Sequence, residues 1–199
     1  MTKENSSVIG RTLTRLFLCA AAVISTVQIG RPQGILGSNL IVNGNAEAGL
    51  AGTPSTVAAS IPGWTVVSGK PNVLAYGQTG GYYPSLADPA PADHGFQFFG
   101  TNLDSGTGIG TVITQPIDVS SVASIVSGDV KYAATAYLGG AGGNETVVIE
   151  FQNSNGQTFS SVQLGPAGFV GSGLSLQEQI GLVPSGTVRV TVTMTLRQC

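Results

Sequence analysis

The sequence predicts an all-β fold, a two-sheet antiparallel β-sandwich, and three observations favour it. Residues 187–196 (TVRVTVTMTL) alternate polar and aliphatic side chains, as a strand with one buried face does. Short segments of this type follow one another along the chain, separated by turns. The composition, with 29 glycines, 10 prolines and no runs of helix-forming residues, is typical of an all-β domain with many tight turns.

Residues 1–30 have the pattern of an export signal peptide or N-terminal anchor. They include the basic residues Lys3, Arg11 and Arg15. The apolar run over residues 16–29 is shorter than the about 20 residues that span a membrane. Residues 31–38 are expected to form a linker, and residues 39–199 the folded domain. We therefore expect a secreted or cell-surface protein, which touches a membrane only through its N-terminal segment if that segment is not cleaved.

The charge distribution argues against a nucleic-acid partner. Half of the eight lysines and arginines precede residue 32, so the domain that follows carries more acidic than basic residues. Nucleic-acid binding needs a basic face, and this domain offers none. Cys19 and Cys199 form neither a closely spaced metal-binding pair nor a disulfide framework, and we interpret them as two unrelated thiols.

The strands follow in order from local patterns. They are expected at residues 39–42, 64–68, 72–76, 94–100, 111–119, 130–138, 146–152, 158–164, 174–183 and 187–196. The first ends in the turn residues Asn43-Gly44-Asn45. Pro62 and Gly63 form a sharp corner before Trp64. We interpret that tryptophan as a core residue rather than as a platform for a sugar.

The later strands are defined by alternation and by turn chemistry. Phe96 and Phe98 are expected on one face of their strand. The following strand directs three side chains inward, namely Ile113, Ile117 and Val119. Pro116 restricts this strand to an edge or a bulge at that point. Residues 153–157 (NSNGQ) predict a hairpin turn between two strands.

Two motifs, residues 39–47 (NLIVNGNAE) and residues 61–64 (IPGW), resemble the opening of galactose-binding-like jelly-roll domains. Relatives include carbohydrate-binding modules of secreted glycoside hydrolases and a plant cell-wall family of unknown function. Residues 95–100 and 113–119 are similar to the next two strands of that family, and the resemblance extends to residue 196. It implies a jelly roll that binds a polysaccharide or glycan without catalysis.

The same resemblance implies a structural calcium ion held by Glu47, the position that matches the family's calcium ligand. In that family, a second acidic calcium ligand lies in a final strand. This sequence stops at Gln198 and Cys199 and lacks that strand. We therefore expect the domain to be C-terminally incomplete, with one strand edge left unpaired. One carboxylate is not enough for calcium, which takes about six to eight oxygen ligands.

The ligand-binding residues are expected in the long loop over residues 77–93 and directly after it. Tyr82 and Tyr83 offer rings for the apolar face of a sugar, and Asp93 and His94 offer hydrogen-bonding groups for its hydroxyls. The alternative is that the loop packs on itself, with the aspartate capping a turn and the histidine lying at a strand edge.

The sequence does not predict an enzyme. It contains a single histidine, and it has no Gly-x-Ser-x-Gly elbow that would mark a nucleophile for it. A small hydrolase that uses His94 is therefore the weaker alternative. A second alternative is an extracellular structural or adhesion module that binds other proteins through its open strand edge.

Overall fold

The computed structural model describes residues 36–58, 60–79, 83–91, 94–102, 110–122, 125, 128–140, 143–168 and 171–197, together with the backbone of residues 14–17. These residues form an all-β structure of packed, mainly antiparallel sheets, which confirms the predicted fold class. The described part of the chain contains no helix that is long and apolar enough to cross a membrane.

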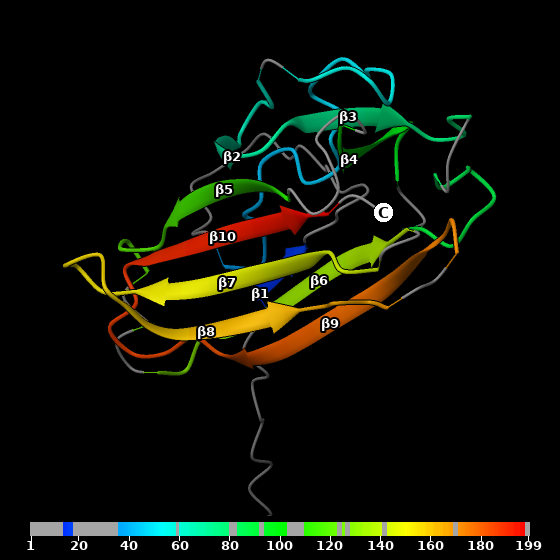
Figure 1. Cartoon of the computed structure of the whole chain (residues 1–199). Coiled ribbons are helices and arrows are strands. Elements are labelled where there is room, and N and C mark those ends of the chain that lie inside the picture. The colour runs from blue at the N-terminus through cyan, green and yellow to red at the C-terminus, as the bar shows by residue number, and fades with distance from the viewer. Residues whose placement is uncertain are drawn as a thin grey trace, which may run out of the picture.

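The described part of the chain contains ten strands in three sheets (Figure 1). One sheet has the order β2-β5-β10-β7-β8, a second has the order β1-β6-β9, and a third is the β3-β4 hairpin. The strands are β1 Thr14–Phe17, β2 Thr65–Ser68, β3 Pro71–Ala75, β4 Gln97–Thr101, β5 Thr111–Asp118, β6 Lys131–Gly139, β7 Thr146–Gln152, β8 Thr158–Leu164, β9 Leu174–Leu182 and β10 Arg189–Leu196.

The strand predicted at residues 187–196 is β10, and it lies at the centre of the five-stranded sheet. It pairs with β5 on one side and with β7 on the other. Val192 and Met194 are fully buried, as the alternation predicts. Their neighbours in the main core come from both layers of the sandwich, with Ile113 on β5, Ile149 on β7 and Ala136 on β6. The core therefore lies between the β5-β10-β7 sheet and β6.

The Trp64 corner belongs to the core. The tryptophan is 7% exposed, its ring meets the edge of Phe99 at a centroid distance of 5.7 Å, and its indole Nε1 donates to the carbonyl of Asn43 at 3.2 Å. The interpretation as a core residue is confirmed. Gly63 precedes it with a φ of 83°, a conformation that glycine adopts without strain.

The predicted strand at residues 39–42 is wrong. This segment is irregular, and Val42 is bonded to the side chain of Gln115 instead of a neighbouring strand. Asn43 and Ala46 have positive φ values of 52° and 63°, so the chain curls immediately afterwards. The backbone groups of Val42 find partners without a strand because a buried side-chain amide supplies both a donor and an acceptor.

The predicted strand over residues 94–100, with Phe96 and Phe98 on one face, begins too early. Phe98 is buried, but Phe96 is 73% exposed and precedes β4, which begins at Gln97. The carboxylate of Glu47 binds the backbone N–H groups of Phe96 and Gln97, so the chain is fixed at this point by a side chain rather than by a strand ladder. The alternation of buried and exposed side chains along β4 therefore does not continue back to Phe96.

The N-terminal segment contributes the strand β1, which pairs in parallel with β6. Residues 1–13 and 18–35 lie outside the described residues. The export signal or anchor, the linker and the domain limits therefore stay predictions.

Candidate functional site

The loop that follows β3 returns to a small apolar cluster beside the β3-β4 hairpin. Leu74, Phe98 and Leu174 form its buried centre. Three tyrosines pack against this centre, namely Tyr76, Tyr83 and Tyr137. The cluster joins the hairpin to the sheet that contains β6 and β9, because Leu174 begins β9. The predicted ligand loop is therefore anchored to the body of the domain.

His94 belongs to the same neighbourhood. Its ring lies 4.9 Å from the ring of Tyr76, which in turn lies 5.2 Å from the ring of Phe98. Its Nδ1 is 2.8 Å from the carbonyl oxygen of Gly95. The structure thus places Tyr83 against this apolar cluster and His94 against Tyr76, which packs on the same cluster. The other two predicted site residues, Tyr82 and Asp93, lie outside the described residues.

Asp88 ties the loop to the segment before β9. Its Oδ2 accepts hydrogen bonds from the backbone N–H of Ser85 at 2.6 Å and from the hydroxyl of Ser172 at 3.3 Å. The backbone bond from Ser85 is the main reason why the pKa of Asp88 is lowered, with the two serine hydroxyls adding to it. An ionised carboxylate at this position therefore holds two parts of the chain together.

Glu47 fixes the backbone beside His94. Its Oε1 accepts the N–H groups of Phe96 and Gln97, each at 2.7 Å. The carbonyl of Phe96 accepts the N–H of Tyr76 at 3.0 Å. Gly95 lies against the Glu47 carboxylate, and any larger residue would place its Cβ on that group. The backbone of Phe96 is therefore fixed by two hydrogen bonds, one to Glu47 and one from Tyr76, while its ring is exposed.

The same contacts test whether Glu47 fits the calcium site that the family resemblance implies. Its Oε1 is already shared by two N–H donors, and the described residues contain no group of three or more His, Cys, Asp or Glu side chains that could hold a metal ion. Calcium needs about six to eight oxygens. The described residues alone do not fit this requirement, and calcium at Glu47 stays a prediction.

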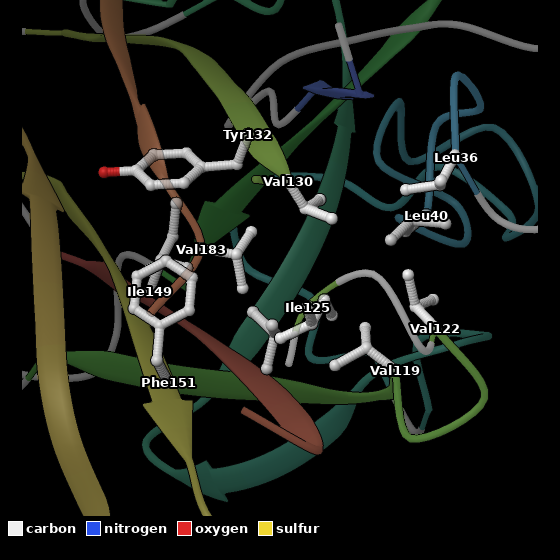
Figure 2. Close-up of a pocket in the computed structure, with 11 residues that line it drawn as sticks. Leu36, Leu40, Val119, Val122, Ile125, Val130, Tyr132, Ile149, Phe151 and Val183 are labelled. Carbon is white, nitrogen blue, oxygen red and sulfur yellow. The ribbon is translucent and has the colours of Figure 1, made fainter. Parts of the chain in front are cut away.

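A second candidate site is an apolar cavity at one end of the sandwich (Figure 2). It measures about 40 Å³ and is lined by Leu36, Leu40, Val119, Val122, Ile125, Val130, Tyr132, Ile149, Phe151, Val183 and Val190. The Tyr132 hydroxyl points away from the aliphatic side chains. Sugar hydroxyls need polar partners when they are buried, so this cavity does not suit a carbohydrate.

A third candidate is a polar hollow of about 300 Å³ at the end of the five-stranded sheet. Asp118 and Arg189, which pair across β5 and β10, lie on one side of it, and Asn153 and Ser154 come from the β7-β8 turn. The pKa of Asp118 is lowered, chiefly because the hydroxyl and the backbone N–H of Ser120 donate to it. The hollow is polar but has no aromatic side chain in its lining.

Sequence reasoning missed the two features that the structure adds. Phe96 was placed inside a strand, although its position directly after Gly95 and the long loop was a signal for an exposed ring. The polar hollow is lined by residues from three distant segments, and no local sequence pattern predicts that these segments lie close together.

Comparisons with known proteins assign no family. No family model matches the sequence, and no curated protein matches it. Among solved structures, the enzymatically active domain of tailspike protein 4 from bacteriophage CBA120 is similar with a TM-score of 0.44 and 16% identity. The match covers 70% of this chain but only 18% of the tailspike chain. A likeness this distant says nothing about a shared activity.

Proposed function

We propose that this protein is a secreted or cell-surface module of the galactose-binding-like type that binds a polysaccharide or glycan without catalysis. The ligand surface is the area around Phe96 and His94, and Tyr83, which packs against the neighbouring apolar cluster, belongs to the same proposal. Tyr82 and Asp93 stay predicted contacts. The observation that carries the proposal is the ring of Phe96, which is 73% exposed on a backbone held by Glu47.

The chemistry of sugar recognition supports this choice. A pyranose has one face rich in C–H groups and a rim of hydroxyls, so it suits an exposed aromatic ring with polar groups around it. Phe96 offers the ring and His94 offers a polar group, while Asp93 stays a predicted contact from the sequence. A fixed backbone lowers the entropy that binding costs, because the ring does not have to be ordered when the ligand arrives.

The environment of His94 favours a non-catalytic role. A histidine in a hydrolytic triad is oriented by a carboxylate and faces a nucleophile. Here the Nδ1 of the only histidine lies against the carbonyl of Gly95, and its ring packs against Tyr76. This arrangement supports a positioning role for the imidazole rather than proton transfer. Turnover on ester or glycoside substrates that is lost in His94→Ala would contradict it.

The decisive experiment compares two exposed phenylalanines. Phe159 lies on β8 in the five-stranded sheet and is 45% exposed, so Phe159→Ala is a matched control for Phe96→Ala. On a glycan array and in polysaccharide pull-down assays, we expect Phe96→Ala to weaken binding about two- to tenfold, since ring contacts contribute about 0.5–1.5 kcal/mol. Phe159→Ala should bind like the unchanged protein. Equal binding by all three proteins would refute the assigned surface.

A second pair of variants separates this surface from the polar hollow. Asp93→Asn and His94→Gln should reduce binding if the Phe96 surface is used. Asp118→Asn and Asn153→Ala should reduce it if the hollow is used. Loss of binding in the Asp118 and Asn153 variants alone would overturn the proposed site. A folded protein that retains no glycan at all would overturn the proposed function.

A further inference from the structure

The strand β9 ends one of the sheets. It pairs with β6 on one side, and no strand of the described residues pairs with its other side. It is nine residues long and lies along the lower margin of the molecule in Figure 1. Three of its aliphatic side chains are half exposed: Leu176 at 49%, Ile180 at 50% and Leu182 at 57%. Natural proteins seldom leave a long apolar edge uncovered.

The backbone of β9 is oriented so that this edge can accept another strand. The N–H of Val183 donates to the carbonyl of Val130 at 2.8 Å, just beyond the end of the β6-β9 ladder. Hydrogen-bonded positions alternate in an antiparallel pair, so residues 175, 177, 179 and 181 also bond to β6. The N–H and C=O groups of Leu176, Glu178 and Ile180 therefore point away from β6.

The sequence of β9 is nearly symmetric about its central residue. Residues 174–182 read LSLQEQIGL, so Glu178 is flanked by a glutamine on each side, then by Leu176 and Ile180, and finally by Leu174 and Leu182. The same alternate positions that direct backbone groups outward carry the aliphatic side chains. The centre of the sequence symmetry thus coincides with a residue whose backbone faces the open edge.

We propose that β9 is a homodimerisation strand, which pairs antiparallel with β9 of a second copy about a two-fold axis at Glu178. Such an axis repeats each contact twice, and because the sequence is nearly symmetric, aliphatic positions face aliphatic positions and glutamines face glutamines in this register. Leu176 of one copy lies opposite Ile180 of the other on the outer face of the sheet, and the outward backbone groups of both copies bond to each other. The two β1-β6-β9 sheets become one continuous sheet.

The pairing is weak because of its centre and its size. Glu178 lies opposite Glu178 of the second copy, and like charges directly opposite each other on a sheet are destabilising. Edge pairing of one short strand also buries less than the roughly 1,600 Å² of a standard stable interface. The association is therefore reversible and depends on protein concentration.

Two substitutions with opposite effects test the pairing by light scattering or analytical ultracentrifugation of the full chain. Glu178→Gln removes the like charges and should tighten the dimer about threefold. Ile180→Asp should weaken it by more than about tenfold, because it adds charge beside Glu178 and removes an apolar contact. Glu150→Gln on β7 and Val67→Asp on β2 are the matched controls, and they should leave the association constant unchanged.

A cross-link tests the register independently of affinity. In a background with Cys19→Ser and Cys199→Ser, a Glu178→Cys substitution places two cysteines opposite each other, with a Cα separation of about 5.5 Å that suits a disulfide. Oxidation should give a covalent dimer from this variant and not from Glu150→Cys. A monomer at every concentration, or equal cross-linking at both positions, would overturn the proposal.

This inference is independent of the carbohydrate site. Phe96→Ala should dimerise like the unchanged protein, and Ile180→Asp should still bind glycan as a monomer. A failure of glycan binding therefore does not count against the dimer, and a failure of dimerisation does not count against the glycan site.

Discussion

The side chain of Gln115 and the backbone of Val42 form a pair of hydrogen bonds of the type that two strands form. The N–H of Val42 donates to Oε1 of Gln115 at 2.8 Å, and Nε2 of Gln115 donates to the carbonyl of Val42 at 3.0 Å. Nε2 also donates to the carbonyl of Gly63 at 2.6 Å. One buried amide thereby holds the irregular opening segment and the tryptophan corner against β5.

This pairing predicts a large cost for Gln115→Leu. The change has nearly the same volume but removes three hydrogen bonds to the backbone of Val42 and Gly63, each worth about 0.5–1.5 kcal/mol. We expect the free energy of unfolding in a denaturant titration to fall by about 3 kcal/mol. Gln163→Leu on the exposed side of β8 is the control and should change it by less than about 0.5 kcal/mol. Equal effects of the two changes would contradict the role of Gln115.

Glu47 is predicted to act through the position of Phe96. Glu47→Ala removes the acceptor of two N–H groups and should lower both the stability, by about 1–2 kcal/mol, and glycan binding. Glu47→Gln keeps a side-chain oxygen at the same place and should retain most of both properties. Thermal unfolding and glycan binding measured on the two variants check this expectation. Two variants of equal behaviour would show that the hydrogen bonds are unimportant.

Glu145 is predicted to destabilise the folded protein at neutral pH. It is 6% exposed, and no described residue gives its Oε2 a hydrogen-bond partner. Burial raises its pKa above the ordinary value of 4.5, against smaller opposing effects of its own backbone N–H and of Arg197. A raised pKa means that the folded state holds the proton more tightly, so stability is lost as the pH rises from below 4.5 through the folded value.

Glu145→Gln should therefore raise the free energy of unfolding at pH 7 by on the order of 1 kcal/mol, with a gain that vanishes below pH 4.5. Glu150→Gln, on a half-buried position of β7, should give no such pH-dependent gain. Denaturant titrations at several pH values measure this difference. A gain of the same size at acidic and neutral pH would show that the charge of Glu145 is not its cause.

Asp88 should have the opposite pH dependence. Its pKa is lowered from 3.8, so the ionised carboxylate stabilises the folded state above that value, and this contribution is lost as the pH falls through the folded value. Asp88→Asn should cost no more than about 1 kcal/mol at pH 7, because the group is partly solvent-exposed, and less in acid. Hydrogen exchange of the Ser85 amide, which donates to Asp88, should become faster in the variant.

The cavity of Figure 2 predicts which core substitution the protein tolerates. Val183→Ile adds one methylene beside a void of about 40 Å³ and should stabilise the protein by up to about 0.8 kcal/mol. Val183→Ala enlarges the void and should destabilise it by about 1–3 kcal/mol. Val192→Ile, in the fully packed centre, is the control and should be destabilising. Thermal and denaturant unfolding measure these changes in stability. If Val183→Ile and Val192→Ile changed the stability in the same direction, the void would not explain the effect of Val183→Ile.

Much of the fold was predictable because it rests on local rules. The strands from β5 to β10 were expected within one or two residues of their limits, since alternation shows which face is buried and turn residues show where a strand ends. The prediction that β5 forms an edge or a bulge at Pro116 also agrees with the structure. Pro116 lies beyond the residues of β5 that pair with β2. These features depend on residues that are close in the sequence.

The site was less predictable, because its contacts join distant segments. The packing of Tyr83 against the Leu74, Phe98 and Leu174 cluster depends on the return of the loop to β9, and the position of His94 depends on the ring of Tyr76. The exposure of Phe96 depends on Glu47, nearly fifty residues earlier. No pattern in either segment reveals the other.

The sequence by itself determined the all-β class, the strand β10 and its buried face, because a period of two in hydrophobicity permits only a half-buried strand. Tertiary structure alone decided that the opening segment pairs with an amide side chain, that Phe96 faces solvent, and that β9 lies at an edge with its symmetric sequence exposed. Those outcomes follow from hydrogen-bond partners and neighbours supplied by remote parts of the chain, whose identity is fixed only when the sheets have packed.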